Sequence, residues 1–241
     1  MGAQEKEALM QRLDVFLDKL KARYTEIMDS ASQPLDDVIN NLQYDTIIII
    51  NINTGLRDQA VNQLIQKAEE GFEKMSSQFY KLGFSGAEEK EAGSKVNDFK
   101  NFIQSEFTKY EVNIYAKAAR KILSNVQQHI NEKKLHRCTQ CGAELPIKIY
   151  SFMSLNFKCE SCGSVNTYVP DDRVRCLEYY VINYLADEKA MPNKLKGLTD
   201  KKANTEYLKE YFGYMIENIP EKKDQYERTL SARLGDLRIF R

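Results

Sequence analysis

The chain has 241 residues, which suits one or two domains, and 42% of them are apolar, enough for a real core. Its 35 basic residues balance its 35 acidic ones, so it lacks the excess positive charge of a dedicated nucleic-acid or membrane-surface binder. The N-terminus is charged and carries no apolar secretory signal, and no apolar run approaches the roughly 20 residues that span a bilayer. We therefore expect a cytoplasmic protein with no membrane partner.

The first part of the sequence predicts an amphipathic helix. Apolar residues recur at spacings of three and four over residues 3–30, and charged residues fill the gaps. Residues 30–34 predict a break, because Ser32 can cap a new helix and Pro34 suits the first turn of that helix.

Residues 46–55 are compatible with two structures. Their β-branched run and the turn signal at residues 53–55 fit a short strand, whereas the apolar positions on either side fit a helix that is broken or kinked near residues 53–55. We favour the helix, and the strand stays the alternative.

A long helix is predicted in the middle of the chain. Glycines and serines at residues 83–94 indicate a linker, and Ser94 can cap a helix that continues to about residue 135. Such a helix needs a partner along most of its length, because an isolated amphipathic helix is not stable in water. We predict that the N-terminal helices pack on it in an elongated hairpin or coiled-coil bundle, so that residues 1–135 form a helical arm.

The last part of the sequence, residues 171–241, predicts a helical segment. Asp171 can cap a helix over residues 172–189, and residues 191–198 look like a connector. A further helix is expected over residues 200–219, and Pro220 can open the last one. The predicted fold class is therefore mainly α, with a small β insertion at residues 136–170.

That insertion contains two identical cysteine pairs in the spacing C-x2-C-x17-C-x2-C, namely Cys138, Cys141, Cys159 and Cys162. Two residues between cysteines let a tight turn aim both thiolates at one metal ion. Gly142 and Gly163 follow the pairs, and glycine permits the positive φ that such turns need. Because cytoplasmic thiols stay reduced, metal binding explains the pairs better than disulfides.

The sequence therefore predicts one structural zinc ion (Zn²⁺) bound by these four cysteines. Iron also suits four thiolates, and the pattern is compatible too with an unmetallated cluster or with two disulfides. Short strands are expected at residues 146–150, 155–158 and 166–169.

Residues 136–170 resemble the four-cysteine zinc ribbon, a broad class with rubredoxin-like knuckles. The resemblance implies that Cys138, Cys141, Cys159 and Cys162 are the ligands and that Gly142 and Gly163 are the knuckle glycines. It implies no particular function, because zinc ribbons occur in transcription factors, ribosomal proteins, nucleases and scaffolds. Four thiolates also leave no open position for water or substrate, which argues against a catalytic metal.

Basic and aromatic residues around the ribbon could form a contact surface for nucleic acid or for a protein partner. Cations follow a phosphate backbone and aromatic rings stack on bases. The alternative is that the aromatic residues pack the ribbon while the cations are solvated. The candidate contact residues are Lys148, Phe152, Phe157, Lys158, Arg173 and Arg175.

The sequence identifies no catalytic residue. His129 has no paired base in the sequence, and Cys176 is better explained as a buried apolar residue than as a nucleophile. We therefore predict a non-enzymatic interaction or assembly protein, a scaffold or adaptor, whose long helices meet a protein partner or a second copy. A nucleic-acid-binding regulator is the first alternative, and an enzyme with a site assembled from scattered residues is the second.

Overall fold

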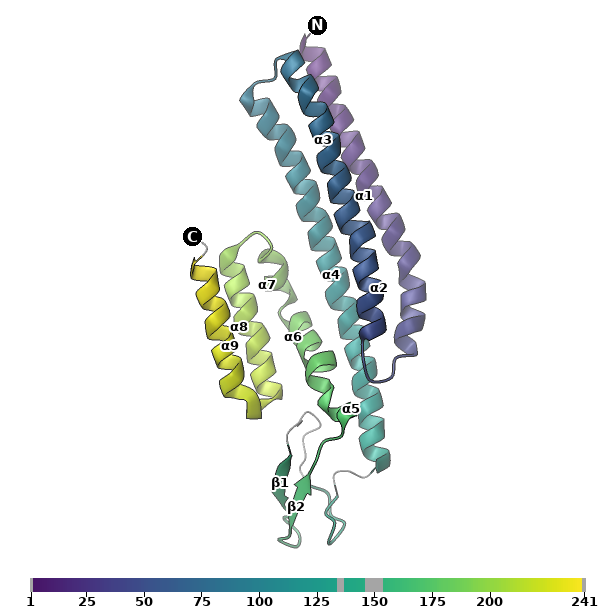
Figure 1. Ribbon diagram of the computed structural model, residues 1–241, viewed down its shortest axis with the longest axis vertical. Helices are drawn as coiled ribbons and strands as arrows, with labels where there is room; N and C mark the ends of the chain where they lie inside the picture. Colours follow the sequence, from purple (N-terminus) through teal and green to yellow (C-terminus); the bar gives the residue numbers. More distant parts are fainter. Residues whose placement is uncertain (1, 134–136, 146–153, 240–241) are drawn as a thin grey trace. The chain divides into compact units, whose positions relative to one another are not determined.

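The computed structural model describes residues 2–133, 137–145 and 154–239, and most of them are helical (Figure 1). A two-stranded antiparallel sheet follows the long helix α4 in the chain, before the C-terminal helices. The predicted fold class, mainly α with a small β insertion, is confirmed. The chain divides into two compact units: unit 1 is Met1–Asp37 with Ile48–Glu111, and unit 2 is Val38–Ile47 with Val112–Arg241. The predicted division at residues 135 and 170 stays a prediction.

Unit 1 is built from long helical segments that lie side by side (Figure 1). Its core contains Leu13, Ile103 and Phe107, all fully buried, because each lies on the apolar stripe of its helix. The elements are α1 (Gly2–Asn40), α2 (Ile47–Arg57), the π-helical turn η1 (Asp58–Asn62), α3 (Gln63–Leu82) and the first part of α4 (Gly86–Lys133).

Helix α1 continues through the break predicted at residues 30–34. Pro34 lies inside the helix, where its missing N–H would ordinarily weaken the turn. The buried side chain of Leu35, only 2% exposed, follows directly, and burial of an apolar face outweighs local propensity. The Ser32 hydroxyl donates to the Asp29 carbonyl, so it does not cap a new helix.

Residues 47–57 form the helix α2, so the strand alternative for residues 46–55 is wrong. Ile49, Asn53 and Leu56 are buried at spacings of four and three, which is helical periodicity. The helix is also not broken near residues 53–55, and the departure from regular α-helix comes later, in η1.

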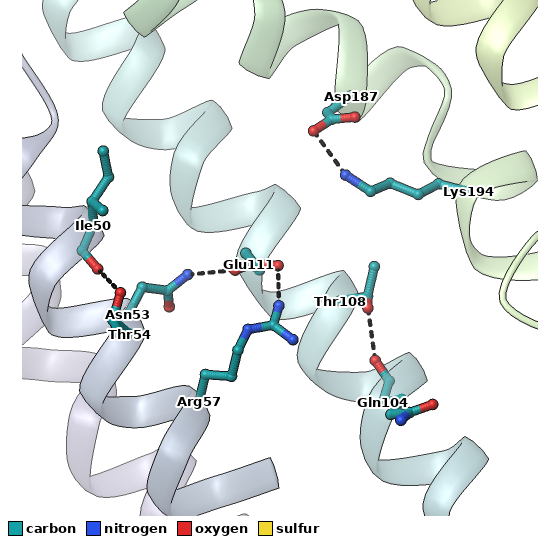
Figure 2. Close-up of polar contacts among 9 residues, drawn as sticks. All are labelled: Ile50, Asn53, Thr54, Arg57, Gln104, Thr108, Glu111, Asp187 and Lys194. Carbon is teal, nitrogen blue, oxygen red and sulfur yellow. Dashed lines mark hydrogen bonds and ion pairs between the residues drawn. The ribbon is translucent and has the colours of Figure 1, made fainter. Parts of the chain in front are cut away.

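A polar network links α2 to α4 within this bundle (Figure 2). The Glu111 carboxylate accepts hydrogen bonds from Asn53 Nδ2 at 3.1 Å and from an Arg57 Nη at 2.5 Å. The Arg57 guanidinium also lies 4.7 Å from the centre of the Phe107 ring. Because Asn53 is 2% exposed, its bond to Glu111 specifies how α2 is oriented against α4.

Helix α4 begins at Gly86, nine residues before the predicted start at residue 95. Ser85 and Glu88 form a capping box: the Ser85 N–H donates to the Glu88 carboxylate at 2.6 Å, and the Glu88 N–H donates to Ser85 Oγ at 3.3 Å. The hydrogen bond from the Ser85 backbone, followed by one from Lys6, lowers the pKa of Glu88 to about 2. Most of the predicted linker at residues 83–94 is therefore helical.

The connector between α1 and α2 belongs to unit 2. Asn125 Nδ2 on α4 donates to the carbonyls of Leu42 and Gln43, each at 2.7 Å. Thr46, which is fully buried, lies 3.3 Å through its hydroxyl from the hydroxyl of Tyr184. The connector is thus held by backbone and side-chain bonds to helices that are remote in sequence.

The C-terminal helices of unit 2 pack on the second half of α4. Ile122, Leu177, Ile182 and Ile219 are fully buried in this core. The elements are α5 (Asp172–Arg175), the π-helical turn η2 (Glu178–Ile182), α6 (Asn183–Lys189), α7 (Met191–Lys196), α8 (Lys201–Asn218), the 3₁₀ turn η3 (Pro220–Lys222) and α9 (Lys223–Ile239). The predicted connector at residues 191–198 is mostly the short helix α7.

Two carboxylates organise the C-terminal helices. Glu178, 7% exposed, accepts hydrogen bonds from Lys222 Nζ and from the Tyr226 hydroxyl, each at 2.5 Å. Asp187 accepts from Lys194 Nζ (Figure 2) and from the Tyr207 hydroxyl, each at 2.7 Å. These bonds fasten η2 to η3 and α9, and α6 to α7 and α8.

None of the helices in the described part of the chain combines the length and apolar character that a membrane crossing requires.

Replacing Tyr226 with Phe should destabilise unit 2. The change leaves one oxygen of the buried Glu178 carboxylate without its hydroxyl donor, which should lower the free energy of unfolding by about 1–2 kcal/mol. Chemical denaturation measures this loss. The matched control is Tyr179→Phe, which removes a hydroxyl from a ring that is 64% exposed and should change stability little. Equal stability of the two variants would contradict the assigned role of Glu178.

Candidate metal centre

The first cysteine pair lies in a tight turn closed by backbone hydrogen bonds. The Cys138 N–H donates to the Ala143 carbonyl at 2.7 Å, and the Gly142 N–H donates to the Cys138 carbonyl at 2.9 Å. Gly142 has a φ of 73°, a value that side chains disfavour. Arg137 and Glu144 form an antiparallel bridge at the base of the turn. The knuckle is therefore the tip of a short hairpin.

The second pair repeats this geometry at the same offsets. The Cys159 N–H donates to the Ser164 carbonyl and the Gly163 N–H to the Cys159 carbonyl, each at 2.8 Å, and Gly163 has a φ of 74°. Its base is the pairing of Lys158 with Val165, the last register pair of β1 (Leu155–Lys158) and β2 (Val165–Tyr168). β1 coincides with a predicted strand, and β2 is shifted by one residue from the predicted residues 166–169. The strand predicted at residues 146–150 lies outside the described residues.

The four cysteine sulfurs converge on one point. All lie within 4.8 Å of one another, with Cys138 Sγ 3.7 Å from Cys162 Sγ and Cys141 Sγ 3.6 Å from Cys159 Sγ. A tetrahedral ion with metal–sulfur bonds of about 2.3 Å would place its sulfurs about 3.8 Å apart. A disulfide needs about 2.05 Å, so these sulfurs are not paired covalently. The four cysteines are positioned to bind a metal ion.

Among the described residues, the apolar cluster around the cysteines is very small. Cys138, Leu145 and Cys159 are its buried members, and Ala143 packs against them. A cluster of this size buries too little apolar surface to order two hairpins, because fixing each backbone residue costs about 1–2 kcal/mol. A metal ion that binds only the folded knuckles would supply the missing folding free energy.

Two polar side chains of the second hairpin contact the sulfurs. Ser164 Oγ lies 3.2 Å from Cys138 Sγ and 3.0 Å from Cys162 Sγ, so it bridges the two knuckles. Asn166, 6% exposed, donates through Nδ2 to Cys138 Sγ at 3.4 Å and accepts through Oδ1 from the Thr139 N–H at 2.9 Å. These contacts fix both hairpins around the same sulfur.

The contacts around the sulfurs shift the pKa values of the thiols in opposite directions. Hydrogen bonding from Ser164 is the main cause that lowers the pKa of Cys138 to about 5, and it also lowers the pKa of Cys162. For Cys141, a hydrogen bond from the Ala143 backbone acts to lower the pKa, but the neighbouring thiols of Cys162 and Cys159 outweigh it and raise the pKa to about 12. The sulfurs are so close that four thiolates need a cation to offset their charge.

A polar cluster lies where the ribbon joins α5, and His129 is its buried member. His129 Nε2 lies 2.5 Å from Asp171 Oδ2, and Arg173 Nη1 lies 3.0 Å from His129 Nδ1. An imidazole that donates from Nε2 to Asp171 and accepts at Nδ1 from Arg173 satisfies both contacts. Asp171 Oδ1 caps α5 by accepting from the N–H groups of Arg173 and Val174, which confirms the predicted cap. The base that pairs with His129 is thus 42 residues away in sequence.

Four of the six predicted contact residues lie in the described part of the chain. Lys148 and Phe152 lie outside the described residues. On β1, Phe157 is half-buried and Lys158 is exposed, because neighbouring strand positions alternate. Arg173 contacts His129 and lies 5.1 Å over the Tyr44 ring, and Arg175 pairs with Asp172 at 3.5 Å. Both arginines thus have contacts within the chain, and the proposed contact surface stays a prediction.

Replacing Ser164 with Ala should weaken metal binding. The change removes the hydroxyl that contacts two sulfurs, and loss of such an outer contact typically costs about 10–100-fold in metal affinity. Competition with a chromophoric chelator measures the affinity. The control is Thr167→Ala, whose hydroxyl bonds Asn156 on the exposed side of the sheet and should leave the affinity unchanged. An unchanged affinity for Ser164→Ala would show that the hydroxyl plays no part in ligation.

Replacing Asp171 with Ala should lower the free energy of unfolding by about 1 kcal/mol at pH 7, through loss of the helix cap. Asp171→Asn keeps a capping oxygen and should lose less stability.

Burial acts to raise the pKa of Asp171, but hydrogen bonds from His129 and from the Val174 and Arg173 backbone leave that pKa lowered. The charge of the carboxylate therefore stabilises the fold above the ordinary pKa of about 3.9, and this contribution disappears as the pH falls through the lowered value. Denaturation at pH 7 and pH 3 tests this, and an Asp171→Asn deficit that grows in acid would contradict it.

No known protein family, curated protein or solved structure matches this chain.

Proposed function

We propose that Cys138, Cys141, Cys159 and Cys162 bind one structural zinc ion, and that the chain is a non-enzymatic interaction or assembly protein, a scaffold or adaptor. The observation that carries the proposal is the convergence of all four sulfurs within 4.8 Å. Four thiolates complete a tetrahedron, so no coordination position is left for water or substrate. The metal then stabilises a fold and takes no part in chemistry.

Zinc is proposed over iron because the described residues around the sulfurs offer only thiols, hydroxyls and amides, without a second redox group. Both metals accept tetrahedral thiolate ligands, so geometry alone does not separate them. Thiolates of this kind persist in a reducing compartment, which is consistent with the expected cytoplasmic location.

The interaction role is supported by the helices of unit 1. Val15 on α1, Tyr80 on α3 and Phe102 on α4 are 49%, 87% and 41% exposed. Large apolar side chains on the outside of a helical bundle are available for contact with a partner helix. A protein whose metal site only shapes the fold would act through such surfaces.

Metal analysis tests the zinc site. The purified chain should contain one zinc ion, and Cys138→Ser combined with Cys162→Ser should abolish binding and melt the ribbon. Helix content measured by circular dichroism should fall little, because both helical cores lie outside the ribbon. Cys176→Ser is the matched control, since Cys176 lies outside the cluster and should leave zinc binding unchanged. A red-brown iron–thiolate absorption, or full zinc content in the double variant, would overturn the assignment.

Isolation from the native host tests the interaction role. A partner, or a second copy detected by light scattering, should co-purify with the wild-type chain at stoichiometric level. The chain with Cys176→Ser should behave identically. A strictly monomeric chain without stoichiometric partners, or substrate turnover that stops when cysteines are replaced, would argue against a scaffold or adaptor.

A further inference from the structure

A groove lies between α1 and α3 on the outside of the unit 1 bundle, with a volume of about 480 Å³. Its apolar lining comes from Val15 and Phe16 of α1 and from Met75 of α3. Val15 is 49% exposed, and the other two are half-buried. These three side chains form the apolar floor of the groove, and part of their surface is exposed to solvent.

Gly71 gives the groove its depth. A Cβ atom placed on Gly71 would come within 2.5 Å of Phe16 Cε1, a distance that no real side chain tolerates. The absence of a side chain at this position lets the Phe16 ring lie against the backbone of α3. The lining runs from residue 11 to residue 19 on α1, about two helical turns, and the apolar face of a short helix can cover that length.

Cations surround the apolar floor. Arg12 and Lys19 line the groove from α1, two helical turns apart. Lys67 and Lys74 lie about one turn before and after Gly71 on α3, so they border the same side. All four are exposed, and within the described part of the chain none of them forms an ion pair.

The acidic side chains of α1 near the groove are bonded to other cations, Asp14 to Lys95 and Asp18 to Lys21. On α3, Glu69 pairs with Lys100, whereas Glu70 bonds the neutral Gln66 and keeps its charge one helical turn from Lys67 and Lys74. Arg12 and Lys19 are therefore the cations beside the apolar groove whose charge no neighbouring carboxylate on α1 offsets. A partner that covers the apolar lining of the groove would therefore complement these cations with carboxylates.

We propose that this groove binds an acidic amphipathic helix of a partner protein. Apolar side chains of that helix cover Val15, Phe16 and Met75, while its flanking Asp or Glu residues face Arg12 and Lys19. A second copy of the chain docked through the same face would oppose cation to cation. A nucleic acid would satisfy the cations but would leave the apolar floor without a complement. The inference rests on the proposed interaction role and names its partner class.

A synthetic peptide tests the proposal with the full-length, metal-loaded chain. The peptide is a helix of about 20 residues with leucines at spacings of three and four and glutamates on both flanks. Its affinity is measured by fluorescence anisotropy at low and high salt. Two control peptides carry lysine in place of glutamate, or the same residues in scrambled order. We expect binding of the acidic amphipathic peptide alone, weakened by salt.

Groove variants locate the binding site. Arg12→Glu with Lys19→Glu should weaken peptide binding about tenfold or more, which corresponds to about 1.4 kcal/mol. Val15→Glu should weaken it as well, through the apolar floor. The matched control is Lys90→Glu with Lys189→Glu, which makes the same charge change at exposed lysines that lie outside the groove and form no ion pairs within the described residues. Circular dichroism confirms that each variant is folded.

Several outcomes would overturn the proposal. They are no peptide binding at low salt, equal binding by the groove and control variants, or a single-stranded oligonucleotide that binds more tightly and competes at Arg12 and Lys19. The proposed interaction role is judged separately, by the native partner. A partner that still co-purifies with Arg12→Glu and Lys19→Glu would refute the groove alone, whereas a chain without any partner would refute the role itself.

Discussion

The 48-residue helix α4 takes most of its stability from the packing of its apolar face, and the fold of this protein depends on how that face is covered. Ile103 and Phe107 of α4 lie in the core of unit 1, and Ile122 and Val126 of the same helix lie in the core of unit 2. Each core is thus built on one continuous backbone. Helices α1 and α3 contribute to the first core and η2, α8 and α9 to the second, so loss of either core would leave half of α4 without support.

Features that depend on local chain geometry can be predicted from the sequence. The cysteine spacing indicates two knuckles, and the positive φ of Gly142 and Gly163 confirms the reason for the glycines. The start of α4 is also readable, because Ser85 and Glu88 have capping-box spacing, although the predicted cap, Ser94, lies within the helix. The break expected before Pro34 is wrong because burial of Leu35 outweighs the local cost of proline. Helix propensities describe local preferences and do not include the burial of a side chain such as Leu35 against other helices.

Contacts between distant residues cannot be predicted in this way. Ser164 touches Cys138, which is 26 residues away, and His129 pairs with Asp171 across 42 residues. Neither pair has a spacing signature, because their approach depends on how the hairpins and helices fold back. The groove cannot be predicted from the sequence either. It depends on the contact of the Phe16 ring with the backbone at Gly71, and a glycine within a helical pattern does not indicate which side chain packs against it. The cysteine site can therefore be predicted from local spacing, whereas the residues that contact its sulfurs cannot.

The connector at residues 38–47 has a consequence for any attempt to divide the molecule. The chain leaves unit 1 at Asp37, contributes a buried Thr46 to unit 2, and returns to unit 1 at Ile48. Neither unit is a continuous stretch, so a single cut cannot release either of them whole. A fragment that starts at residue 112 lacks the segment whose carbonyls bond Asn125, and one that ends at residue 111 retains that segment without its donor. A fragment that contains the whole of unit 2 would therefore need residues 38–47 as well as residues 112–241.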